Sequence, residues 1–82
     1  DNKKNDNNLY YIQIGVYKNE SIAKDIKNKF KKISLETNIR NITINDINYF
    51  QLYIGFFDLK DDALKIRDNL KENNIDCIIK KD

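Results

Sequence analysis

Residues 10–23 read YYIQIGVYKNESIA, and residues 50–63 read FQLYIGFFDLKDDA, which repeats the same pattern forty positions later. Both stretches carry an Ile-Gly pair, an aromatic residue two places after the glycine, and an alanine six places beyond that aromatic residue. In each stretch, alternating side chains predict a β-strand, and the spacing that follows predicts a helix. The chain therefore contains two strand–helix units of similar sequence.

The remaining segments extend each unit by one further strand. The second strand has an untidy pattern, because Ile42 and Ile44 share one face while Ile39 falls on the other, which indicates a bulge or an edge strand. The segment NDIN at residues 45–48 has the chemistry of a hairpin turn. The predicted elements are a strand over 9–17, a helix over 20–33, strands over 37–44 and 49–57, a helix between 58 and 73, and a strand over 76–80.

Each predicted helix has one apolar stripe. In the first helix the stripe is expected to contain Ile22, Ala23, Ile26, Phe30 and Ile33, with Asn19 as the N-cap. In the second helix it is expected to contain Ala63, Ile66 and Leu70, with Asp58 or a neighbour as the N-cap and the Asn73-Asn74 pair as a left-handed stop.

The order β-α-β-β-α-β decides the fold class. Each half has one apolar strand face and one apolar helical stripe, and neither half can bury both alone. Interleaving the halves predicts an α+β, ferredoxin-like (RNP-like) fold, with a four-stranded antiparallel sheet and two helices on one face. Right-handed crossovers place the strands over 9–17 and 49–57 in the centre. Residues 1–8 have no apolar side chain and are expected to be a disordered tail or the end of a linker, so the domain is assigned to residues 9–81.

Composition argues against most catalytic and cofactor-dependent functions. The 82 residues include no histidine, which is the usual general base and the commonest metal ligand, and one cysteine, Cys77, which the pattern places on the core face as a small apolar group. A net charge of +2 is too weak to predict nucleic-acid binding. No apolar run is long enough to span a membrane. We predict no enzymatic activity, no cofactor and no metal.

The two units resemble a SPOR domain, the sporulation-related repeat of bacterial cell-envelope proteins. In that family a strand with the pattern aromatic, apolar, Gln, apolar, Gly, any residue, aromatic precedes a helix with an early alanine. A second strand–helix unit follows about forty residues later. Residues 11–17 (YIQIGVY) and Ala23 fit the first unit, and Leu52, residues 54–57 (IGFF) and Ala63 fit the second. The resemblance covers about residues 9–80.

The resemblance implies a binding function. SPOR domains bind peptidoglycan and prefer denuded glycan strands, from which amidases have removed the stem peptides, and they therefore concentrate at the division septum. A monomeric targeting module of a larger bacterial envelope protein, on the extracytoplasmic or periplasmic side, is implied. Any membrane attachment would come from a segment outside this chain, and nucleic acid is not an expected partner.

The family binds glycan on the sheet face that the helices leave bare. Aromatic rings stack on the C–H faces of sugars, and amides supply both donors and acceptors. Gly15 and Gly55 are expected to lower this face, and Arg40 or Lys80 to pair with the lactyl carboxylate of muramic acid. The predicted glycan-binding residues are Tyr11, Gln13, Val16, Arg40, Tyr49, Gln51, Tyr53 and Ile78.

Two of these residues match the family pattern and two depart from it. Gln13 is the glutamine of the first strand, and Tyr49 stands where an aromatic residue often precedes the third strand. Gln51 stands where arginine is common, and Val16 where a small polar residue, often serine, is usual.

Two other functions share parts of this pattern. An RNA-recognition-like domain has the same element order and stacks single-stranded bases on central-strand aromatics, a role open to Tyr11 and Tyr53. However, this chain lacks the basic-Gly-aromatic motif of that class. A protein-interaction domain would use the bare face or a strand edge.

Overall fold

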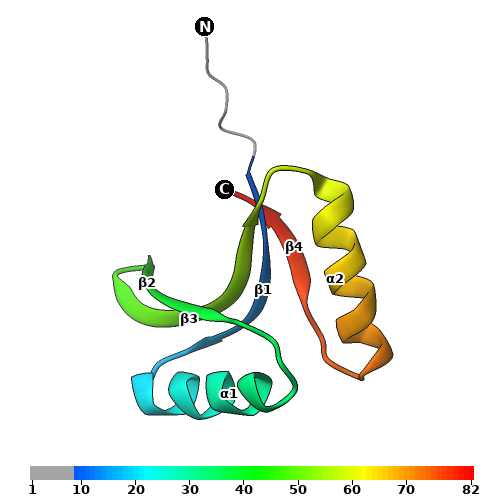
Figure 1. Ribbon diagram of the computed structural model, residues 1–82. Helices are drawn as coiled ribbons and strands as arrows, with labels where there is room; N and C mark the ends of the chain where they lie inside the picture. The colour runs from blue at the N-terminus through cyan, green and yellow to red at the C-terminus, as the bar shows by residue number, and fades with distance from the viewer. Residues whose placement is uncertain (1–8) are drawn as a thin grey trace, which may run out of the picture.

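The computed structural model describes residues 9–82, so the tail predicted over residues 1–8 lies outside the described residues. Figure 1 shows the predicted order β-α-β-β-α-β. The elements are β1 (Tyr10–Tyr17), α1 (Glu20–Lys32), β2 (Asn38–Ile44), β3 (Ile47–Phe57), α2 (Lys60–Glu72) and β4 (Ile78–Lys81). The hairpin turn is tighter than predicted, because Asn45 and Asp46 alone form it with φ of 51° and 66°, so β3 begins at Ile47.

The four strands form one antiparallel sheet in the order β2-β3-β1-β4, which confirms the predicted fold class and the central position of β1 and β3. β2 is an edge strand, and its pairing with β3 runs without a register shift. The irregularities lie instead between β1 and β3. One falls between Gln13 and Gly15 of β1, and the other lies where the pairing steps from Tyr11↔Gly55 to Tyr10↔Phe57.

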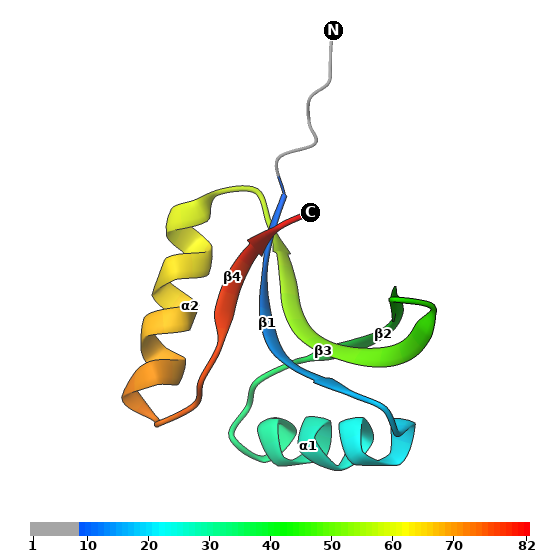
Figure 2. The same ribbon diagram turned by 180° about the vertical axis from the view of Figure 1, so that it is seen from behind.

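These two irregularities bear on the shape of the molecule, since β-bulges bend strands and increase their twist. Figures 1 and 2 show a strongly bent sheet with both helices on its convex side. Within the described residues, neither helix lies on the concave side. We call this uncovered side the concave face.

The apolar core lies between the sheet and the helices. Its main cluster contains Ile12, Ile54, Ala63 and Leu70, from β1, β3 and α2. Leu52 of β3 and two residues of α1, Ala23 and Phe30, are also buried. The predicted stripe of α1 is too wide, because Ile22 and Ile33 are 44% and 53% exposed. Ile22 lies at the flank of the stripe, and Ile33 follows the last helical residue, Lys32.

The internal repeat extends to the ends of both helices. Asn74 has φ of 62°, which confirms the predicted left-handed stop, and Ser34 occupies the same position of α1 with φ of 65°. In each unit the residue two places after the C-cap donates its N–H to a carbonyl of the last turn, from Leu35 to Phe30 and from Ile75 to Leu70. This is the Schellman motif, and it directs the chain back to the sheet in both halves.

Thr37 offers a direct test of this packing. Its side chain is 2% exposed, and its Oγ1 has no hydrogen-bond partner among the described residues. Because a buried hydroxyl without a partner costs about 1–3 kcal/mol, Thr37→Val is expected to raise the free energy of unfolding by about 1 kcal/mol. Urea titration measures this change.

Thr43→Val is the matched control, because the exposed Thr43 Oγ1 donates to Asn48 Oδ1 at 3.1 Å. The control is expected to bring no gain. A larger loss of stability in Thr37→Val than in Thr43→Val would show that the Thr37 hydroxyl is satisfied in solution.

Candidate functional site

Three aromatic rings gather on the concave face, where β1 and β3 run side by side. Tyr11 comes from β1, and Tyr53 and Phe56 come from β3. The ring of Tyr11 meets the other two edge to face, with centroid distances of 5.9 Å to Tyr53 and 5.8 Å to Phe56. Tyr53 and Phe56 are 5.5 Å apart. Such geometry is favourable for aromatic pairs and yields a continuous apolar surface.

The guanidinium group of Arg40 lies over all three rings. Its Cζ is 4.8 Å from the ring centroid of Tyr11, 4.9 Å from that of Tyr53 and 5.6 Å from that of Phe56. All three distances are within the range of cation–π attraction. Arg40 therefore packs against the aromatic cluster.

A chain of hydrogen bonds holds this arginine in place. Arg40 Nε donates to Gln51 Oε1 at 2.7 Å, and Gln51 Nε2 donates to Gln13 Oε1 at 2.8 Å. The three residues lie on neighbouring strands, β2, β3 and β1, so the network crosses the sheet. On its outer side, Arg40 Nη1 is 3.6 Å from Asp82 Oδ1. We call the set Tyr11, Gln13, Arg40, Gln51, Tyr53 and Phe56 the Arg40 cluster.

Burial divides the Arg40 cluster into a floor and a surface. Tyr11 is 7% exposed and Gln51 is 2% exposed, so these two side chains support the cluster from below. Gln13, Arg40 and Tyr53 are half-buried, and Phe56 is exposed. A ligand on the concave face would therefore contact Gln13, Arg40, Tyr53 and Phe56. Tyr11 and Gln51 would hold those side chains in place.

The other predicted site residues lie around the cluster. Val16 is opposite Gln51 in the β1–β3 pairing, and Ile78 is opposite Gln13 in the β1–β4 pairing. Tyr49 lies two residues before Gln51 on β3. The structure thus brings Tyr11, Gln13, Arg40, Gln51 and Tyr53 into one network and places Val16, Tyr49 and Ile78 on the same face beside it. The alternative cation, Lys80, is opposite Tyr11 on β4.

The expectation for the two glycines was wrong. The register shift after Gln13 pairs Gly15 with Leu52, which belongs to the helix side, and the ring of Tyr17 lies over Gly15. Gly55 does lie opposite Tyr11, but a Cβ there would come within 2.9 Å of Tyr11 Cβ. Gly55 therefore permits the close approach of the two strands, and Tyr11 fills the space that a ligand was expected to use.

The two glycines should respond differently to alanine. At Gly55 the obstacle is Tyr11 Cβ, which cannot move without its strand, so Gly55→Ala is expected to destabilise the domain by about 1–3 kcal/mol, as overpacking does. At Gly15 the obstacle is the far end of the Tyr17 side chain, which can rotate, so Gly15→Ala is expected to cost less. Urea titration of both variants checks the ranking, and a Gly15→Ala cost equal to or above that of Gly55→Ala would contradict this account.

Phe56 is the site residue that the sequence pattern does not reveal. Strict alternation along β3 puts residues 50, 52, 54 and 56 on the helix side, yet Phe56 contacts Tyr11 and Tyr53 on the concave face. The irregularity in the β1–β3 register near Phe56 breaks the alternation. Phe57, the aromatic residue two places after Gly55, packs against the core cluster.

Few of the described side chains outside the concave face have a shifted pKa or could serve as reactive groups. Cys77 is a free, half-buried thiol that packs against the core cluster, and burial raises its pKa, so little thiolate forms at neutral pH. Burial also raises the pKa of the Tyr17 phenol. No group of three or more potential metal ligands occurs within residues 9–82, and in that range no helix is long and apolar enough to cross a membrane.

Comparisons with known protein families and solved structures agree with this architecture. The SPOR domain model matches residues 6–81, so the chain belongs to the SPOR domain family, as the resemblance predicted. A similar solved structure is the solution structure of the peptidoglycan binding domain of the B. subtilis cell wall lytic enzyme CwlC. It is 21% identical, has a TM-score of 0.72, and the match covers 98% of this chain and 96% of that chain, so the two share a fold. No curated protein matches this chain.

Proposed function

We propose that this domain is a non-catalytic module that binds peptidoglycan through its concave face. Membership in the SPOR family supports the proposal, as does the shared fold with a peptidoglycan-binding domain. The observation that carries it is the Arg40 cluster, in which Gln51 holds a guanidinium group over the rings of Tyr11 and Tyr53.

The exposed part of the Arg40 cluster suits a glycan strand. The rings of Tyr53 and Phe56 offer apolar area to the C–H faces of pyranose rings, and the half-buried amide of Gln13 can bond to hydroxyl or acetamido groups. The bent sheet arranges these groups along its concave side, and a curved row of contacts suits a chain ligand better than a flat sheet would. Tyr49, Val16 and Ile78 extend the surface beyond the cluster.

The charge of Arg40 favours strands without stem peptides. Removing the stem peptide frees the lactyl carboxylate of muramic acid, and a guanidinium group binds a carboxylate through two parallel N–H donors. The Asp82 carboxylate faces Arg40 Nη1 at 3.6 Å with a side chain that is 46% exposed, and so exposed an ion pair is weak. A glycan carboxylate would take the place of Asp82.

We propose that this preference makes the domain a targeting module. An attached peptide would clash with the concave face, whereas a bare strand would not, so selectivity arises from exclusion as well as attraction. In the bacterial envelope, denuded glycan is found where amidases act during division. A larger envelope protein carrying this domain would thus be concentrated at the septum.

The direct experiment is co-sedimentation of the domain with purified peptidoglycan before and after amidase digestion. Denuded-strand recognition predicts that more protein sediments with the digested material at every concentration. Equal sedimentation with both materials would overturn the preference for bare strands but leave peptidoglycan binding intact. No sedimentation with either would overturn the proposed function.

Gln13→Ala combined with Tyr49→Ala tests the site. These side chains contribute an amide and an aromatic surface, each expected to be worth roughly 1 kcal/mol, so the double variant should bind digested peptidoglycan about thirtyfold more weakly. Gln13→Ala also leaves the buried Gln51 Nε2 without its 2.8 Å acceptor, so the double variant is expected to lose about 1–2 kcal/mol of stability, which urea titration measures separately from binding. Asn28→Ala with Lys65→Ala, two exposed helix residues, is the matched control and should bind normally. Unchanged sedimentation of the Gln13/Tyr49 variant would remove these two residues from the site.

A further inference from the structure

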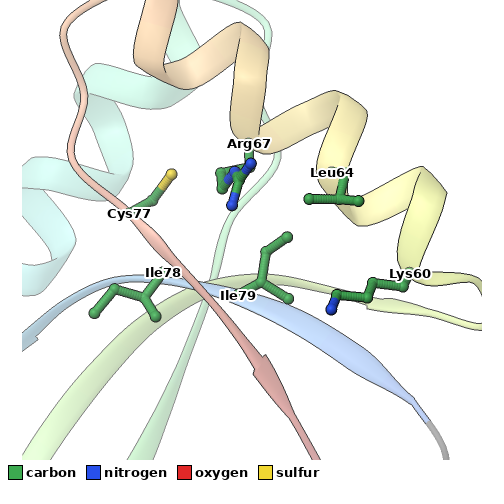
Figure 3. A pocket seen from close by; sticks show the side chains of 6 residues that line it. All are labelled: Lys60, Leu64, Arg67, Cys77, Ile78 and Ile79. Atoms are coloured by element: carbon green, nitrogen blue, oxygen red, sulfur yellow. The ribbon is translucent and has the colours of Figure 1, made fainter.

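A pocket lies away from the Arg40 cluster, between α2 and β4. Figure 3 shows this pocket, whose volume is about 350 Å³. That volume is within the range of sites that hold small ligands or single side chains with their flanking backbone. Its lining is partly apolar and partly cationic and comprises Lys60, Leu64, Arg67, Cys77, Ile79 and Ile78, although the side chain of Ile78 points to the other side of β4 (Figure 3).

The helix side of the pocket has a cation at each end and a leucine between them. Lys60, Leu64 and Arg67 are spaced at i, i+4 and i+7, so they share one face of α2. At 1.5 Å per residue, Lys60 and Arg67 start about 10 Å apart along the helix axis. Figure 3 shows their nitrogen atoms on the side of the helix that faces β4. An extended peptide covers the same length in about three residues.

One hydrogen-bond donor of Arg67 has no acceptor among the described residues. Its Nε is buried and has no partner among the described residues. Its Nη2 lies 3.3 Å from Asp68 Oδ1, but the Asp68 side chain is 65% exposed, so this ion pair is weakened by solvent. Because Nε is closed off from solvent, a carboxylate in the pocket would bind the terminal nitrogens of the guanidinium group, whose side chain is 32% exposed, through charge-assisted hydrogen bonds.

The strand side of the pocket is a sheet edge. Within residues 9–82, β4 pairs with β1 alone. The Asp82 N–H donates to the Leu9 carbonyl at 2.8 Å, so by the alternation of antiparallel pairing Lys80 and Ile78 also face β1. The backbone groups of Ile79 and Lys81 therefore face away from the sheet. Such an edge accepts a further strand.

We propose that the α2–β4 pocket binds the carboxyl-terminal end of an extended peptide. The peptide pairs with the outer edge of β4, and its last, apolar side chain packs between Leu64 and Ile79. Its terminal carboxylate binds Arg67, and an acidic residue three positions earlier reaches Lys60. The charge of the pocket, its length and its open strand edge all select this partner. The proposal is independent of glycan binding on the concave face.

The probe is the peptide acetyl-Glu-Val-Thr-Leu with a free carboxylate, followed by amide chemical shifts of the labelled domain. Shift changes at Leu64, Cys77 and Ile79, with none at Arg40 or Tyr53, are expected. The same peptide with a terminal amide should bind at least about tenfold more weakly, since it lacks the charge-assisted bond. Absence of shifts at millimolar peptide, or equal affinity of acid and amide, would overturn the proposal.

Variants and a smaller probe separate the parts of the argument. Arg67→Gln should abolish the difference between acid and amide, whereas Lys65→Gln, an exposed residue of the same helix, should preserve it. Well-dispersed spectra of both variants establish that the fold is kept. N-acetylleucine should bind more weakly than the peptide. Equal affinity for N-acetylleucine would show that the β4 edge contributes nothing and would overturn the assignment to a peptide.

Discussion

Arg40→Ala is expected to weaken binding to amidase-treated peptidoglycan by about a hundredfold. The change removes a charge-assisted contact to the glycan carboxylate, and such contacts contribute about 1.5–3 kcal/mol each. It also removes the guanidinium group that packs against the aromatic rings of Tyr11 and Tyr53. Sedimentation isotherms of the wild-type and variant domains measure the effect.

Two variants separate the geometry of Arg40 from its charge. Arg40→Lys keeps the charge but loses the Nε–H donor to Gln51 and the flat group over the rings, so intermediate binding is expected. Arg67→Ala removes the same charge from a different surface and should leave glycan binding unchanged. If Arg40→Ala and Arg67→Ala bind alike, attraction depends on net charge, and the Arg40 cluster is not the binding site.

Arg40→Ala also has a defined cost in stability. It leaves Gln51 Oε1 without its 2.7 Å donor in a side chain that is 2% exposed, which is expected to destabilise the domain by about 1–2 kcal/mol. The domain should stay folded, because domains of this kind typically have a free energy of unfolding of about 5–15 kcal/mol. Urea titration separates this loss from the loss of binding.

Leu52→Ala is expected to have the largest effect on stability, about 3 kcal/mol. Leu52 is fully buried on a central strand, and removal of a buried leucine side chain costs its transfer free energy together with that of the cavity left behind. In a domain of this size, such a loss lowers the melting temperature by roughly 12–24 °C. Thermal and urea unfolding both report it.

Leu59→Ala is the matched control, because the same side chain is deleted from a residue that is 62% exposed. Its unfolding free energy should change by less than about 0.5 kcal/mol, as is usual for surface positions. Similar losses for Leu52→Ala and Leu59→Ala would contradict a core built between the sheet and the helices.

The fold can be predicted from the sequence because the same strand–helix pattern occurs twice in the chain. Both units carry the same strand pattern and the same helical stripe, and the structure adds matching left-handed stops at Ser34 and Asn74. Two half-copies that each leave an apolar face uncovered have few ways to cover them. Interleaving the two halves covers both apolar faces, and the observed strand order β2-β3-β1-β4 is interleaved in this way.

The site follows from the sequence only in part, because alternation holds only where the strands pair regularly. Tyr11 and Gln13 of β1, and Tyr53 of β3, lie between the two register shifts. Gln51 precedes both shifts along β3. The predicted face of all four residues is therefore correct. Gly15 and Phe56 lie at the shifts and change sides. A one-residue irregularity depends on how two strands pair, and neither strand's pattern contains that information.

Burial on the concave face was equally hidden from the sequence. Tyr11 and Gln51 alternate like exposed residues, yet they are among the least exposed side chains of the domain. Their burial results from the bend of the sheet and from Arg40, which reaches across from the edge strand β2. Residues that are far apart along the chain create this environment, so only their three-dimensional arrangement reveals it.

The central claim is that glycan binds the concave face at the Arg40 cluster. Titration of the labelled domain with soluble glycan strands, released from peptidoglycan by amidase and a glycosidase, tests it most directly through amide chemical shifts. The account predicts saturable shifts at Gln13, Arg40, Tyr53 and Phe56, with none along the outer surface of α1. Shifts confined to the helices, or no shifts at saturating glycan, would contradict it.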